Sequence, residues 1–123
     1  MEIRKGRRGR VQLLELSGRM SAGEVPKLEK QLAELREAAQ PEVAQHVVLD
    51  VTALDNLPSA VVGALLETIR TLEAAGGRLV LAGSHEAIRL VLDRLGVGDL
   101  VGRYDSLDAA VEALAADDSA PGA

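Results

Sequence analysis

The sequence contains no cysteine, and Tyr104 is its only aromatic residue. Without cysteine there can be no disulfide, no thiol nucleophile and no cysteine-ligated metal, which is compatible with a reducing compartment. Because phenylalanine and tryptophan are also absent, the core has to be built from aliphatic side chains. A single aromatic ring offers no platform on which successive bases could stack, which argues against single-stranded nucleic acid as a ligand.

Long apolar runs and an excess of positive charge are missing as well. No stretch approaches the roughly 20 apolar residues that a membrane-spanning helix needs, and the charged N-terminus does not resemble a signal peptide. We therefore expect no membrane insertion and a cytoplasmic location. The formal net charge of −5 argues against a nucleic-acid partner. With 123 residues, 47% hydrophobic and 27% charged, the composition is that of one soluble globular domain.

The stretch from residue 46 to residue 66 is the most informative part of the chain. Residues 47–51 form an apolar run rich in β-branched side chains, which predicts a strand buried on both faces. After a polar turn, Pro58-Ser59 precedes apolar residues at helical spacing: Val62, Leu65, Leu66, Ile69 and Leu72. Proline suits the first turn of a helix and serine can cap its free N–H groups. The local chemistry by itself favours Ser59 as a helix N-cap.

Predicted strands and helices alternate along the rest of the chain. The N-terminal part predicts an edge strand at 1–5, a turn at 6–9, a strand at 11–17 and a helix from about 25 to 40. The C-terminal part predicts a strand at 78–82, a helix with Ile88, Val91, Leu92 and Leu95 inside, a short strand at 100–104, and a helix capped by Asp105-Ser106. We expect an α/β domain over residues 1–115, with a mixed sheet and a disordered tail at 116–123.

The first hairpin is locally basic, since it carries Arg4, Lys5, Arg7, Arg8 and Arg10. The favoured interpretation is a set of solvated charges that protect an edge strand against aggregation. A docking surface for an acidic partner stays open as an alternative.

We find no catalytic constellation in the sequence. Asp50 and Asp55 follow a central strand, as a phosphoacceptor aspartate would, but the acidic pair that should hold a divalent cation after the strand at 11–17 is missing. Hydrogen bonds that these aspartates accept from turn amides are the favoured interpretation. His46 and His85 lie in separate elements and are expected at the surface. No phosphate-binding loop is present, so we expect neither enzyme activity nor a cofactor or metal.

Two segments together resemble the signature of the STAS domain, the family of bacterial anti-sigma-factor antagonists. The strand end Leu49-Asp50-Val51-Thr52 matches the family's Leu-Asp-Leu-Ser, and Pro58-Ser59-Ala60-Val61-Val62-Gly63 falls on its Asp-Ser-Ser-Gly-Leu-Gly helix start. Ser59 and Gly63 keep the motif, whereas Pro58, Ala60 and Val61 replace its aspartate, second serine and first glycine. Weaker matches at residues 16–18, 76–79 and 106–110 extend the resemblance along nearly the whole chain.

The resemblance implies a single STAS-like domain with about five strands and about four helices packed mainly on one face. It implies a regulatory module that binds an anti-sigma factor or a serine kinase of the anti-sigma type, with a partner phosphatase as a further possibility. Ser59 takes the phosphoacceptor position. Expected contacts come from this helix start and from the loop before the first helix: Met20, Ser21, Gly23, Pro58, Ser59, Ala60, Val61, Ala64 and Thr68.

A scaffold or adaptor that never switches is the alternative, either a stressosome-like assembly unit or an accessory subunit of a transport system. Pro58 and the bulk of Val61 fit a domain that its kinase no longer recognises. Val61, Ala64 and Thr68 also lie off the core-facing stripe of the predicted helix, so they are expected to form a permanent apolar contact patch.

Overall fold

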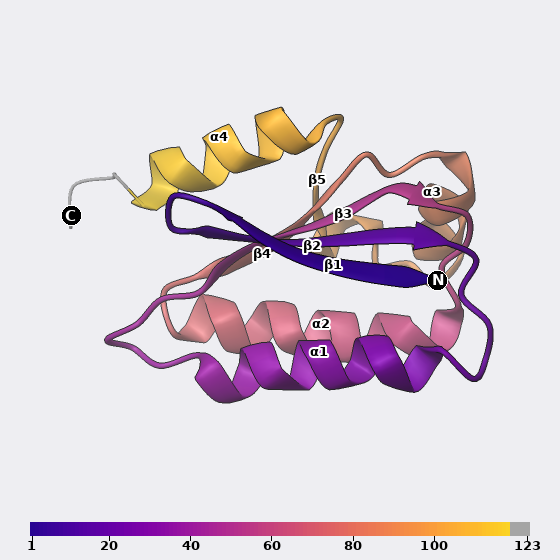
Figure 1. The fold of residues 1–123 in the computed structure, drawn as a ribbon, viewed down its shortest axis with the longest axis horizontal. Helices are drawn as coiled ribbons and strands as arrows, with labels where there is room; N and C mark the ends of the chain where they lie inside the picture. The colour runs from indigo at the N-terminus through magenta and orange to yellow at the C-terminus, as the bar shows by residue number, and fades with distance from the viewer. Residues whose placement is uncertain (119–123) are drawn as a thin grey trace.

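One five-stranded sheet organises the computed structural model, which describes residues 1–118 (Figure 1). The strands are β1 (Glu2–Arg8), β2 (Val11–Gly18), β3 (His46–Leu54), β4 (Arg78–Ala82) and β5 (Gly102–Tyr104). The helices are α1 (Val25–Ala38), α2 (Ser59–Ala74), α3 (Glu86–Arg94) and α4 (Leu107–Asp118), with a 3-10 turn η1 (Gly98–Leu100). The strands lie side by side in chain order. Only β1 runs antiparallel to its neighbour, which confirms the predicted mixed sheet with a hairpin at its edge.

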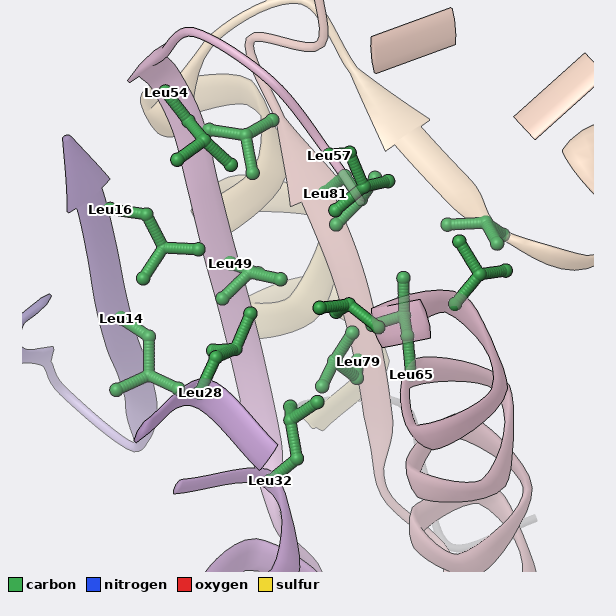
Figure 2. Packing of buried hydrophobic residues seen from close by; sticks show 14 of the residues in the cluster. Leu14, Leu16, Leu28, Leu32, Leu49, Leu54, Leu57, Leu65, Leu79 and Leu81 are labelled. Carbon is green, nitrogen blue, oxygen red and sulfur yellow. The ribbon is translucent and has the colours of Figure 1, made fainter. Parts of the chain in front are cut away.

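The helices cover the two faces of the sheet unequally. Figure 1 shows α1 and α2 on one side of the sheet and α4 on the other. The buried residues of α1, α2 and α3 belong to the same large core cluster, whereas α4 packs on a smaller cluster of its own. Three of the four helices thus share one face, as predicted. Figure 2 shows leucines of the strands and of α1 and α2 pointing toward one another in the larger cluster.

The central strand β3 supplies both clusters. Val47, Leu49 and Val51 belong to the larger cluster and Val48 to the smaller one, as expected when successive side chains of a strand point to opposite faces. All four side chains are fully buried. The predicted strand, buried on both faces, is confirmed.

Three local predictions are wrong. The hairpin turns at Gly9-Arg10 and not over residues 6–9, because Gly9 adopts a φ of 60° that suits the first position of a two-residue turn. Leu95 was expected inside but is 46% exposed, because α3 ends at Arg94. The last strand begins at Gly102, because η1 occupies the residues just before it.

The C-terminal helix extends beyond the predicted domain end. Ser106 Oγ accepts the N–H of Ala109 at 3.1 Å, which confirms the predicted cap at this helix start. The predicted tail, residues 116–123, falls partly on α4, which continues to Asp118. Residues 119–123 of that tail lie outside the described residues. Within residues 1–118, no helix is both long enough and apolar enough to cross a membrane.

Candidate functional site

Parallel pairing gathers three loops at one edge of the sheet. Because β2, β3 and β4 run parallel, their carboxyl ends meet there, and each leads through a loop into α1, α2 or α3. Helices α1 and α2 lie side by side and begin at this same end (Figure 1). The edge beyond the carboxyl ends of parallel strands is where α/β domains commonly place their binding sites.

Ser59 is the first residue of α2, and Pro58 holds the N-cap position. Pro58 has an extended conformation, with φ −61° and ψ 137°, and its carbonyl accepts the N–H of Val61 at 3.0 Å. The prediction of Ser59 as the N-cap is therefore wrong by one position, because proline already satisfies the geometry of helix entry. Ser59 is exposed, and its hydroxyl forms no hydrogen bond with any part of the chain between residues 1 and 118.

The exposed side of the first two turns of α2 carries only small residues. Ser59, Ala60 and Gly63 are all exposed, and Gly63 lies three positions from Ala60 and four from Ser59, so it shares a side of the helix with both. A Cβ added to Gly63 would meet no atom within 4 Å, so the space above this glycine is open. The first turn contains no acidic side chain to offset the partial positive charge of the helix N-terminus.

The predicted apolar patch on α2 is not at the surface. Val61 and Thr68 are 0% exposed and Ala64 is half-buried. Arg36 of α1 reaches across to this side of α2, where its Nη1 lies 2.7 Å from Thr68 Oγ1 and 3.4 Å from the carbonyl oxygen of Ala64. The prediction fails because α1 covers a second side of α2, and the sequence of α2 alone does not reveal that neighbour.

The loop between β2 and α1 divides into buried and exposed residues. Ser21 and Gly23 are exposed, as a contact surface requires, but Met20 is only 2% exposed and its side chain lies in the core. An amide that sequence reasoning missed fixes the backbone of Met20. Asn56 Oδ1 accepts the Met20 N–H at 2.8 Å, and Asn56 Nδ2 donates to the Met20 carbonyl at 2.9 Å. The signal available was an amide, able to donate and accept at once, within a polar turn.

Further hydrogen bonds join the same loops. The N–H of Asp55 donates to the carbonyl of Gly18 at 2.9 Å, and His85 Nε2 lies 2.6 Å from the carbonyl oxygen of Leu54. Since a carbonyl only accepts, this ring nitrogen carries the proton. The three loops are therefore tied to one another around the end of β3.

Asp50 and His46, two other polar residues considered in the sequence, do not belong to this surface. Asp50 Oδ1 accepts the N–H and the hydroxyl of Thr52, at 3.0 and 2.6 Å. Asp50 thus bonds a backbone amide, but Thr52 belongs to β3 and not to the predicted turn. His46 is 5% exposed and lies at the opposite end of β3, so the prediction of a surface position is wrong. Among the described side chains, those of residues 1–116, no three His, Cys, Asp or Glu residues are grouped as a metal site would need.

Glu24 links the N-terminus of the chain to the site. Its Oε2 lies 2.7 Å from the N-terminal ammonium of Met1, and its Oε1 accepts the N–H and the hydroxyl of Ser21, both at 3.1 Å. These hydrogen bonds, the ammonium first, lower the pKa of Glu24 to about 2. The Ser21–Glu24 pair lies in the turn that precedes α1, and α1 begins at Val25 as expected.

The structure of an anti-sigma factor antagonist from Mycobacterium paratuberculosis aligns with a TM-score of 0.78 and 21% identity, over 93% of this chain and 93% of that chain. The structure of the anti-sigma factor antagonist SpoIIAA in its unphosphorylated form aligns with a TM-score of 0.74 and 20% identity, over 94% of this chain and 97% of that chain. The structure of Bacillus SpoIIAA in its phosphorylated form aligns with a TM-score of 0.66 and 18% identity, over 91% of this chain and 99% of that chain.

These identities are low, so the structural likeness shows a shared fold. A comparison with curated proteins finds no match. The family model of the STAS domain matches residues 2–110, which is most of the chain. By that match, the chain belongs to the STAS domain family.

Proposed function

We propose that this domain is a regulatory protein-binding module that acts as anti-sigma-factor antagonists do. In this proposal it binds an anti-sigma factor or a serine kinase of the anti-sigma type, and the binding surface is the start of α2 together with Ser21 and Gly23. Phosphorylation of Ser59 by the partner kinase releases the partner, and a phosphatase restores binding.

The single observation that carries the proposal is the state of the Ser59 hydroxyl. It is exposed and free of intramolecular hydrogen bonds within residues 1–118, at the first position of a 16-residue helix. A kinase could reach it without unfolding the helix. The neighbouring bulk expected at Val61 is buried, so it does not obstruct this approach.

Charge explains how one modification could release a partner while the domain stays folded. A phosphoserine adds about −1.5 to −2 charge and three acceptor oxygens. The N-terminus of α2 favours an anion at this position, and its first turn holds no acidic side chain that would repel one. A partner surface matched to a neutral hydroxyl would lose affinity, because the added charge has to be desolvated against it.

Gly63 supports a close contact at the same surface. Glycine inside a helix costs about 0.5–1 kcal/mol relative to alanine, and nothing within 4 Å in the fold requires its lack of a side chain. An approaching partner backbone would require it. Ser59, Ala60 and Gly63 would then form the floor of the contact.

The scaffold alternative retains one supporting observation. Pro58 replaces the aspartate that precedes the phosphoacceptor in the family motif, so a kinase that reads this carboxylate would find none. The permanent apolar patch expected for the scaffold does not support it, because Val61 and Thr68 are buried and Thr68 contacts Arg36 of α1.

Mass spectrometry of the protein isolated from its own cells tests the proposal. Intact mass and phosphopeptide mapping across growth and stress conditions should find one phosphate on Ser59 whose occupancy changes with condition. A protein that is never modified there would favour the scaffold.

A second experiment separates charge from shape. Ser59→Asp and Ser59→Asn differ in charge and hardly in size, and each is compared with wild type for recovery of the partner from the same cells. We expect the asparagine variant to retain the partner and the aspartate variant to lose it. Equal recovery by both variants would refute the electrostatic switch.

A further inference from the structure

A polar cavity of about 430 Å³ opens at the end of the sheet opposite Ser59. One wall comes from the β1–β2 hairpin, with Arg7, Arg10 and Gln12, and the other from the connection that leads into β3, residues 41–46. The cavity therefore lies at the amino ends of the parallel strands β2 and β3, whereas Ser59 follows their carboxyl ends. Neither the STAS signature nor the proposed switch uses any of these residues.

The walls of this cavity are polar, and contacts within the fold hold His46, Gln12 and Gln45 in place. His46 lines it and is 5% exposed, so its ring is held by the surrounding structure. Gln12 Nε2 donates a hydrogen bond to Gln45 Oε1, which joins the two walls. The backbone of Gln45 is anchored in turn, because its carbonyl accepts the N–H of Arg78 at 3.0 Å. Arg7 and Arg10 bring positive charge to the lining, and Glu42 is the one acidic side chain in it.

Arg7 differs from its charged neighbours on β1. Lys5 lies 3.8 Å from Glu34 of α1, and Arg8 forms an ion pair with Asp108 of α4. Arg7 has no such partner among the side chains that the structure describes, those of residues 1–116. It also borders a second cavity, of about 300 Å³, that shares Gln12 with the first. Its guanidinium group is thus available at the junction of two hollows.

We propose that this cavity binds a small oxyanion with more than one phosphate or carboxylate group, held mainly by Arg7. Planar guanidinium groups match such groups with paired hydrogen bonds, and the amides of Gln12 and Gln45 provide the uncharged donors that orient a ligand. The volume falls within the range of small-molecule sites. The domain would then carry a ligand site separate from the Ser59 surface.

Calorimetric titration of the full chain with pyrophosphate and with citrate, at constant ionic strength, tests the site. We expect saturable one-to-one binding of at least one probe, and the stronger probe identifies which of the two groups the site prefers. Arg7→Gln should weaken that binding by roughly tenfold or more, the usual scale for the loss of a charge-assisted contact.

Arg4→Gln provides the matched control. Arg4 lies on the same strand and carries the same charge, but it lies three positions from Arg7 and so points to the other face of the sheet. We expect its replacement to leave the affinity unchanged. Equal weakening by both variants would show diffuse attraction to a basic hairpin, and would overturn the proposal, as would the absence of saturable binding of either probe.

Amide chemical shifts locate the bound probe. Changes should centre on Gln12, Gln45 and His46, while the amides of Ser59 and Ala60 stay unchanged. Shifts centred on the start of α2 would contradict the proposal. The outcome is independent of the phosphorylation test, because Arg7→Gln alters neither Ser59 nor its surroundings.

Discussion

Two layers at the same edge of the sheet differ in what holds them. The lower layer consists of the loop residues that contact one another within the chain. Met20 and Asn56 belong to it through their two hydrogen bonds, and Gly83 belongs to it because it lies against Thr52. The upper layer, Ser59, Ala60 and Gly63, is exposed, and the surroundings of Gly63 are empty to 4 Å. Contacts within the fold therefore explain the residue types of the lower layer. The residue types of the upper layer have no such explanation and are consistent with contact to a partner.

This contrast can be tested by comparing stability with binding. Changes in the lower layer should lower the free energy of unfolding, because they leave buried groups unpaired or crowded. Changes in the upper layer should leave that free energy nearly unchanged or raise it.

Gly83→Ala should have the largest effect, a loss of about 3 kcal/mol in the free energy of unfolding. Gly83 follows β4 with a φ of 70°, and a Cβ there would collide with the side chain of Thr52. Gly96→Ala is the matched control, since Gly96 has a φ of 68° but nothing within 4 Å of its Cβ position. Denaturant unfolding of both variants separates the collision from the backbone strain. Equal losses would show that Thr52 moves aside at little cost.

Asn56→Ala should cost about 2 kcal/mol, because it leaves the N–H and the carbonyl of buried Met20 without partners. Asn56→Asp should lose less, since a carboxylate still accepts the N–H but cannot donate to the carbonyl. Chemical denaturation ranks the two. An alanine variant as stable as wild type would mean that the loops at this edge are held by other contacts.

The acid dependence of stability reports on Glu24. Because folding lowers its pKa to about 2 from an ordinary value of 4.5, this carboxylate stabilises the fold above pH 4.5, and that contribution disappears as the pH falls from 4.5 toward 2. The effect should be modest, since Glu24 retains 21% exposure of its side chain. Glu24→Gln should remove this part of the acid dependence when melting is followed across pH. Parallel curves for the two proteins would contradict the assignment.

Local patterns in the sequence correctly predicted the strands and helices that depend on residues close together in the chain. The β-branched run 47–51 predicted the central strand, and the spacing of Val62, Leu65 and Ile69 predicted the helix that follows it. Both patterns show which side chains must be buried, so they predict the element correctly whichever part of the fold covers it.

Contacts between distant segments account for the failures. Val61 and Thr68 are buried because α1 lies beside α2, and Arg36, which completes that contact, is 32 residues from Thr68 in the chain. Asn56 reaches Met20 across 36 residues. No periodicity within a single helix or turn carries information about such a partner, so only the structure separates the exposed residues of the predicted contact set from the buried ones.

Gly63→Ala should raise the free energy of unfolding by about 0.5–1 kcal/mol and weaken partner binding. Alanine suits a helix interior, and the added methyl group meets nothing in the fold. Thermal melting measures the first effect, and recovery of the partner measures the second. A more stable variant that binds as wild type does would show that no partner approaches Gly63 closely.

Ser59→Asp should change stability least, by about 0.5 kcal/mol or less, and in the stabilising direction. Its carboxylate would face the partial positive charge at the start of α2, in a first turn without other acidic residues. Ser59→Lys places the opposite charge at the same exposed position and should shift the melting temperature the other way. If both variants lower stability equally, the hydroxyl of Ser59 contributes to the fold itself, and its modification could not act through the partner surface alone.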